Sequence, residues 1–173
     1  QLRTPFKVNA GASVMLAKAG LVSVEYEYNN TRSTRLTGAD GDATGFAVIN
    51  QDARDMFKDV HRVKAGTEWW VLSNLALRAG YAYQTALTRD NACRYVMNNT
   101  TRTDMHYSLD GATHYASAGL GYRTNTFFVD LAYQYKWMKE DLYSFENLSA
   151  GTLNPIDLTS SRHSAILSVG FRF

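Results

Sequence analysis

Three histidines have the residue type and the regular spacing that first suggest a metal or haem site. His61, His114 and His163 each stand where a stretch of alternating apolar residues begins, and imidazole is a common ligand of zinc and of haem iron. If these stretches are alternate strands of one sheet, neighbouring histidines lie about 10 Å apart, too far to share one ion. We therefore expect them to be residues of a membrane-water interface, and we predict no metal and no other cofactor.

Acid-base and nucleophilic chemistry have equally little support. Glu25 and Glu27 are two residues apart on one side of a stretch, but no neighbouring nucleophile or second group separates their pKa values. Cys93 is the one cysteine, so it forms no intramolecular disulfide, and nothing in the sequence places a base beside it. We predict that the chain is not an enzyme and has no catalytic residues.

The elements that carry these residues are strands. In seven stretches the apolar residues fall at every second position, which is the period of a β-strand. They are residues 6–14, 22–29, 62–69, 75–84, 116–123, 127–137 and 161–173. Short turns at 17–20, 71–74 and 123–126 alternate with long polar connections at 31–60, 85–112 and 139–160. This order predicts an all-β, antiparallel, up-and-down meander of hairpins.

The first long connection also contains a helix signal. Residues 50–58 favour a short helix, with Asn50 as its N-cap and Asp52 in its first turn.

The contents of the two faces decide between a β-sandwich and a membrane barrel. The apolar register of the seven stretches holds no Asp, Glu, Lys or Arg, whereas the other register holds many charged residues with Gly, Ser and Asn. Aromatic residues gather near both ends of the apolar register, as they do at the two lipid-water interfaces of an outer-membrane barrel. A sandwich has no reason for two such belts, so the sequence predicts a transmembrane β-barrel in the bacterial outer membrane.

Strand parity and overall composition limit the alternatives. Bacterial single-chain barrels have an even number of strands, so we expect at least one further strand before Gln1. The competing account is an eighth strand hidden around residues 93–97. A net charge of +2, without basic runs, argues against nucleic acid as a partner. No stretch has the ~18 consecutive apolar residues of a membrane-spanning helix.

Several stretches resemble one known family. They are TPFKVNAG at 4–11, GLVSVEYEY at 20–28, DMFK at 55–58, LRAGY at 77–81 and VGFRF at 169–173. In this order they are similar to the C-terminal half of the FadL-type outer membrane transport proteins in their Bacteroidetes form. The likeness extends from about Thr4 to Phe173. It implies that residues 1–173 are the C-terminal part of one fourteen-stranded barrel domain, with these seven strands as its eighth to fourteenth.

The resemblance also implies a function. That family moves long-chain fatty acids and other hydrophobic molecules passively across the outer membrane, so the expected partners are a hydrophobic small molecule, outer-membrane lipid and lipopolysaccharide. The closing aromatic strand is typical of the signal that the barrel assembly machinery reads. The alternatives are a structural or adhesive barrel and an ion-conducting porin. The family's plug and exit gap belong to its other half, so the resemblance assigns no ligand-binding residue to this chain.

Charged residues of the polar register are the remaining candidate site. They are Lys7, Glu25, Glu27, Arg62, Lys64, Glu68, Arg78, Asp130, Lys136, Arg162 and Arg172. The basic members can bind a fatty acid carboxylate, but we favour a network of wall charges that pair across strands. The candidate ligand contacts are Lys64, Glu68, Arg78 and Lys136. Lys64 and Arg78 can lie near each other because a short turn joins their strands.

Apolar residues of the long connections are a last candidate surface. They can capture a hydrophobic ligand, or they can pack on one another to cap the barrel. They are Phe46, Val48, Ile49, Met56, Phe57, Tyr95, Val96, Met97, Tyr143, Phe145 and Leu148.

Overall fold

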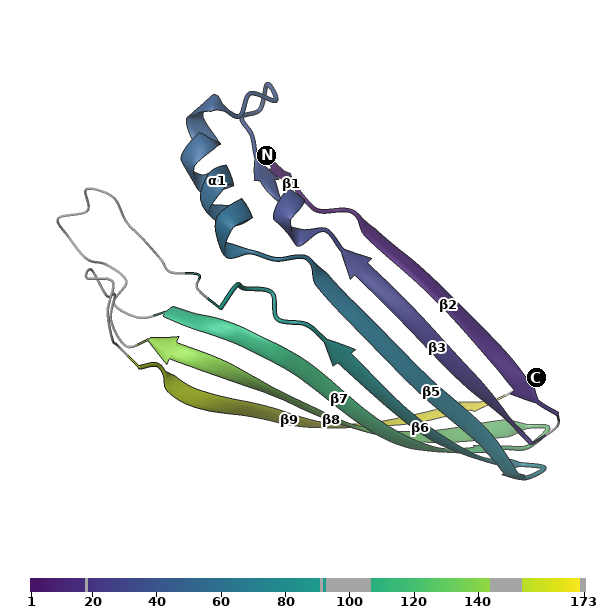
Figure 1. Ribbon diagram of the computed structural model, residues 1–173. Helices are drawn as coiled ribbons and strands as arrows, with labels where there is room; N and C mark the ends of the chain where they lie inside the picture. The colour runs from purple at the N-terminus through teal and green to yellow at the C-terminus, as the bar shows by residue number, and fades with distance from the viewer. Residues whose placement is uncertain (18, 91, 93–106, 144–153, 172–173) are drawn as a thin grey trace.

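The computed structural model describes residues 1–17, 19–90, 92, 107–143 and 154–171, and most of them belong to one sheet. Its seven strands are β2 (Lys7–Leu16), β3 (Gly20–Asn29), β5 (Val60–Leu72), β6 (Leu75–Gln84), β7 (Tyr107–Arg123), β8 (Phe127–Tyr143) and β9 (Ile156–Phe171). Each strand pairs antiparallel with the next, in the order β2-β3-β5-β6-β7-β8-β9 (Figure 1). The predicted up-and-down meander of seven strands is confirmed.

The connections also alternate as predicted. Short turns join β2 to β3, β5 to β6 and β7 to β8 at one end of the sheet, while α1 and the described parts of the long connections lie at the other (Figure 1). A short turn is sufficient here because antiparallel neighbours need only a tight hairpin to reverse the chain. Among the described residues the sheet stays open, with β2 and β9 as its two edges.

Three strands extend further toward the long connections than the apolar alternation predicted. β7 begins at Tyr107 instead of residue 116, β8 continues to Tyr143, and β9 begins at Ile156. Backbone pairing of β7 with β8 continues past a bulge between Asp110 and Thr113. Hydrogen bonds between backbones need no apolar pattern, so the alternation marks only the part of each strand that has an apolar face. Residues 93–97, where the competing account places an eighth strand, lie outside the described residues, and Cys93 is one of them.

The first long connection and the N-terminal residues together form a small cap. Strands β1 (Leu2–Arg3) and β4 (Arg35–Leu36) pair with each other, and two 3-10 turns, η1 (Thr31–Ser33) and η2 (Thr44–Phe46), precede the helix α1 (Ala47–Met56). None of the helices in the described residues has the length and apolar character to cross a membrane.

The expected helix is present, but its predicted start was wrong. The N-cap position is Phe46, without a side-chain cap, so Asn50 lies inside α1 and no acidic residue stands in the first turn. Asn50 is buried and uses its side-chain amide on β4 instead. Its Oδ1 accepts a hydrogen bond from the Leu36 N–H at 2.7 Å, and its Nδ2 donates to the Leu36 carbonyl at 2.9 Å. Asn50 therefore ties the helix to the strand.

Replacing Asn50 by leucine is expected to loosen this cap, because two backbone groups of Leu36 lose their partner. The loss is about 1–3 kcal/mol of local stability, the cost of leaving such groups unsatisfied. Hydrogen exchange at the Leu36 amide measures the effect, and its exchange should be faster in the variant. The matched control is Gln51→Ala, which changes the exposed neighbouring residue and should leave the Leu36 amide protected.

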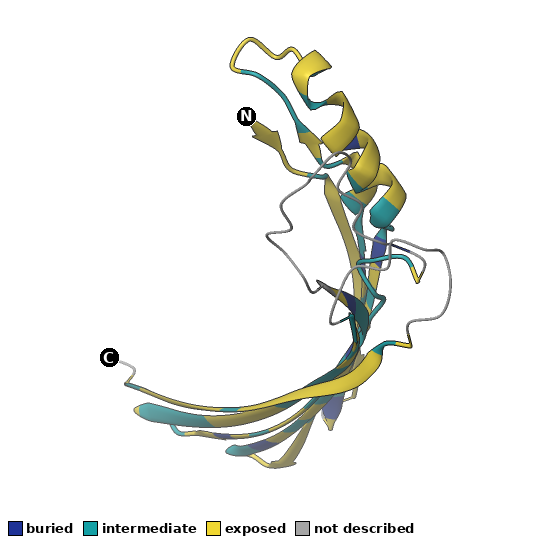
Figure 2. Ribbon diagram, turned by 90° about the vertical axis from the view of Figure 1, so that its left-hand side faces the viewer, coloured by how far each residue is buried: buried dark blue, intermediate teal, exposed yellow. Residues whose placement is uncertain are grey.

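Burial on the central strands β3, β5 and β6 is inverted relative to a water-soluble protein, whereas β2 and β9 are exposed on both faces at almost every residue. On β3 the apolar Val22, Val24 and Tyr26 are exposed, whereas Glu25 is half-buried and Glu27 is buried. We call the polar register the inner face and the apolar register the outer face. The sheet is strongly curved (Figure 2). Side chains on the concave side of a curved sheet are crowded together, so the lower exposure of the polar residues is what we expect if they lie on that side.

Nothing in the described part of the chain covers the outer face. Leu131 is 45% exposed and Leu167 66%, and no large side chain in the described residues is completely buried. Within the described ranges, the apolar side of the sheet therefore has no second layer of the kind that a sandwich would place there.

Candidate functional site

The candidate residues lie on the inner face. Residues that are direct partners on successive strands form rows that run across the sheet, perpendicular to the strands. The middle row consists of small or neutral residues on all seven strands. It contains Ser13, Ser23, Gly66, Gly80, Ser117, Gln134 and Ser164. Charged residues lie in the rows on both sides of this one, so the inner face has two ionic zones separated by a band of small residues.

The first ionic zone lies toward the long connections and centres on Glu27. Its carboxylate is 2.8 Å from Lys7 Nζ, 3.4 Å from an Arg62 guanidinium nitrogen and 3.6 Å from Lys64 Nζ. Lys64 also donates to Glu25 at 2.8 Å. A carboxylate that is only 7% exposed needs such partners, because burial of an unpaired charge is costly. This zone ties β2, β3 and β5 together through their side chains.

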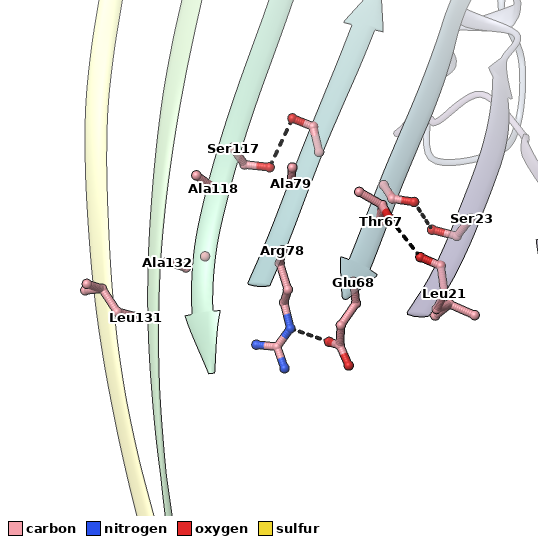
Figure 3. Close-up of a pocket in the computed structure, with 13 residues that line it drawn as sticks. Leu21, Ser23, Thr67, Glu68, Arg78, Ala79, Ser117, Ala118, Leu131 and Ala132 are labelled. Carbon is pink, nitrogen blue, oxygen red and sulfur yellow. Dashed lines mark hydrogen bonds and ion pairs between the residues drawn. The ribbon is translucent and has the colours of Figure 1, made fainter. Parts of the chain in front are cut away.

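The second ionic zone lies toward the short turns and centres on Arg78 of β6. Its Nε donates to Glu68 on β5 (Figure 3), and its Nη1 lies 2.6 Å from Asp130 Oδ1 on β8. Arg123 of β7 approaches the same aspartate at 3.9 Å. One guanidinium therefore joins strands on both sides of its own, because its N–H groups are spread over a planar fork and point in different directions.

Two glycines on β7 give Arg78 its path to Asp130. Gly119 and Gly121 lie between β6 and β8, and a Cβ at Gly121 would stand 3.2 Å from a terminal guanidinium nitrogen of Arg78. The same Cβ would stand 2.6 Å from Asp130 Oδ1, so a side chain at this position would displace the carboxylate as well as the guanidinium. The absence of a side chain is what allows the arginine to cross β7.

The predicted site residues are thus only partly brought together. Glu68 and Arg78 face each other and are paired, as the network of wall charges predicted. Lys64 and Arg78 are on neighbouring strands, but they belong to different ionic zones. Arg78 is opposite Glu68, which is four residues along β5 from Lys64 and hence roughly 13 Å away. The expectation that Lys64 and Arg78 lie near each other was therefore wrong.

Lys136 belongs to neither zone. It lies on β8, opposite Tyr115 on one side and Arg162 on the other, and its Nζ stands 5.9 Å from the centre of the Tyr115 ring. Arg172 lies outside the described residues. Arg123 was not among the expected residues, although its position in the polar register of its strand was a usable signal.

The outer face carries one arrangement three times. In each group a histidine Nδ1 lies within hydrogen-bond distance of one tyrosine hydroxyl, while the imidazole ring contacts a second tyrosine. The groups are Tyr26, Tyr28 and His61; Tyr81, Tyr83 and His114; and Tyr133, Tyr135 and His163. The Oη to Nδ1 distances are 2.6, 2.7 and 2.6 Å. Each imidazole is therefore within hydrogen-bond distance of one tyrosine and in ring contact with another.

These groups form a belt at one end of the apolar band. Trp137 extends it by stacking on His114, with ring centroids 5.0 Å apart. Trp69, Tyr122 and Phe171 are exposed on the same face toward the short turns, and valine, alanine and leucine lie between the two sets. Sequence reasoning found the tyrosine pairs and the histidines separately. It missed their contact, although each tyrosine pair is followed by its histidine at a similar distance in the sequence, 35, 33 and 30 residues after the bonded tyrosine.

The apolar loop surface is described only in part. Val48 and Ile49 on α1 are 72% and 53% exposed. Tyr95, Val96, Met97, Phe145 and Leu148 lie outside the described residues.

Comparison with protein-family models gives no match for this chain, and comparison with curated proteins gives none either.

Proposed function

We propose that this chain is the C-terminal half of a fourteen-stranded transmembrane β-barrel in the bacterial outer membrane. The observation that carries the proposal is the inverted burial of the sheet, with exposed apolar residues outside and partly covered charges inside. An outer-membrane barrel has this distribution, because its outer face contacts lipid and its inner face contacts water.

The topology supports closure by additional strands. Six successive antiparallel pairings separate β2 from β9, so these two edge strands run in the same direction. Direct pairing of β2 with β9 would be parallel, and so would pairing of β9 with β2 of a second copy. An odd number of intervening strands keeps every pair antiparallel, and seven give the fourteen that the resemblance implies. Closure is needed because unpaired backbone groups in lipid cost several kcal/mol each.

The function that this architecture best supports is passive transport of long-chain fatty acids or other hydrophobic small molecules. The chain resembles the FadL-type transport proteins. An apolar ligand would gain about 25 cal/mol for each Å² of its surface that leaves water on entering the barrel. Outer-membrane lipid and lipopolysaccharide would contact the outer face and its belts. The barrel assembly machinery would recognise the C-terminal strand.

A second candidate is a structural or adhesive barrel that transports nothing. The two ionic zones favour it, because ion pairs join β2 to β3 and β5, and β5 to β6 and β8, along the inner face. Such ion pairs can also block the interior of a barrel and so prevent passage of a ligand.

Uptake into liposomes separates the candidates. The complete protein, reconstituted in vesicles that contain a pH-sensitive dye, should accelerate the entry of oleate over protein-free vesicles. Unchanged uptake would contradict transport and favour the adhesive barrel. The ion-conducting porin would instead give stepwise conductance in planar bilayers, which a plugged transporter should not show.

A further inference from the structure

Two cations on the inner face differ from the others. Five basic residues of that face have a carboxylate within 4.0 Å, and they are Lys7, Arg62, Lys64, Arg78 and Arg123. Lys136 and Arg162 have none among the residues that the structure describes. They are direct partners in the register of β8 and β9, so two positive charges face each other across the strands.

Opposed like charges destabilise a sheet, because their side chains are close and repel each other. Lys136 lies over the Tyr115 ring at 5.9 Å instead of beside a carboxylate. Conflicts of this kind between local and global preferences are concentrated at functional sites. A bound oxyanion would remove the repulsion, since it would accept hydrogen bonds from both cations.

The surroundings continue this pair into an amphipathic path. The next row toward the short turns holds Gln134 and Ser164, and the row after it holds Ala132 and Ile166. Ile166 breaks the alternation of its strand by placing an apolar side chain on the inner face, where it is 63% exposed. It lies roughly 13 Å along β9 from Arg162. Along the inner face, a row of cations is therefore followed by a row of polar residues and then by a row of apolar residues. This order matches an amphipathic molecule that has a charged head group and an apolar tail.

A hollow on the inner face reaches this region from the side of β5. Its volume is about 370 Å³, and Arg62, Lys64, Tyr115, Ser117 and Gln134 are among the residues that line it. Tyr115 and Gln134 are neighbours of Lys136, so the hollow extends from the first ionic zone to residues beside the pair, although neither Lys136 nor Arg162 lines it.

We propose that Lys136 and Arg162 bind the oxyanion head group, carboxylate or phosphate, of an amphipathic ligand whose tail lies over Ala132 and Ile166. The inference rests on the proposed function and adds a particular site to it. Both side chains donate hydrogen bonds to the head group, and arginine can do so with two parallel N–H groups.

The test compares ligands that differ in the head group, with the complete protein in detergent micelles. Equilibrium binding is measured for oleate, for dodecyl phosphate and for oleyl alcohol, which has the oleate tail without its charge. The Lys136→Gln, Arg162→Gln double variant should bind oleate or dodecyl phosphate about tenfold more weakly or worse, the effect of losing charge-assisted hydrogen bonds. Its affinity for oleyl alcohol should stay within about twofold.

Further variants separate the head from the tail. Ile166→Ser should weaken oleate and oleyl alcohol alike, because it removes apolar contact. Lys139→Gln is the matched control: it removes a positive charge from β8 at an exposed residue of the opposite register, and it should change neither affinity. Thermal unfolding followed by circular dichroism verifies that every variant is folded.

The outcomes distinguish this site from the proposed function. If all three ligands bind the folded double variant as they bind the original protein, the site is overturned and transport is not. A strand paired with β9 would then supply the acidic partner of the two cations. If none of the ligands binds the original protein, the proposed function fails and this site fails with it.

Discussion

Replacing Leu167 by arginine is expected to lower the free energy of unfolding in lipid vesicles by roughly 2–4 kcal/mol, the cost of a basic residue at the bilayer midplane of a barrel. Leu167 is on the outer face of β9, 66% exposed, and midway along the strand between His163 and Phe171 of the two aromatic belts. In water, arginine at such an exposed position would be almost neutral. The size of the effect therefore reports whether the outer face contacts acyl chains. Denaturant titration with tryptophan fluorescence measures it.

The adjacent residue provides the control. Ser168 faces the opposite side of β9, directly opposite Asp130 of β8. Ser168→Arg introduces the same side chain one residue further on, where it can contact water and the Asp130 carboxylate. It should therefore change the free energy of unfolding by less than about 0.5 kcal/mol. Equal effects of the two substitutions would contradict the assignment of the two faces. An effect near zero at Leu167 would contradict a membrane-facing outer side.

The sheet could be predicted from the sequence because every strand has to meet the same physical requirement. Each strand must separate apolar from polar side chains, and period-two alternation is visible without any tertiary knowledge. The same signal failed at the ends of β7, β8 and β9, where backbone pairing continues and neither face needs to be apolar. It also failed at Asn50, whose preference for an N-cap yielded to a pair of hydrogen bonds with Leu36.

Pairing on the inner face could be predicted only as a tendency. Alternating charges indicated ion pairs, but the partner of each charge depends on the strand register. Residues of β5 and β6 meet in reverse order, so Arg78 reaches Glu68 while Lys64 is placed opposite Ala82. The reach of Arg78 to Asp130 depends in addition on two glycines of a third strand, and a pattern read along single strands does not reveal such a contact.

Replacing Arg78 by methionine is expected to have the second large effect. Methionine retains much of the apolar stem and removes the charge, so Glu68 loses its ion-pair partner and Asp130 keeps only Arg123, at 3.9 Å. Removing one partner of a buried pair costs 3–5 kcal/mol, but Arg78 is 32% exposed and water screens the charges that remain. We therefore expect a loss of about 2 kcal/mol in the free energy of unfolding.

Three further variants separate loss of charge pairing from loss of packing. Arg78→Lys retains the charge but not the fork, so it should recover only part of the loss, since a compact ammonium group lacks the spread N–H groups that reach Glu68 on one side and Asp130 on the other. Adding Glu68→Gln and Asp130→Asn to Arg78→Met removes the two uncompensated charges and should restore most of the stability. If this triple variant is no more stable than Arg78→Met alone, packing of the arginine stem, and not its ion pairs, holds β5, β6 and β8 together. Denaturant titration of all the variants in the same vesicles provides the comparison.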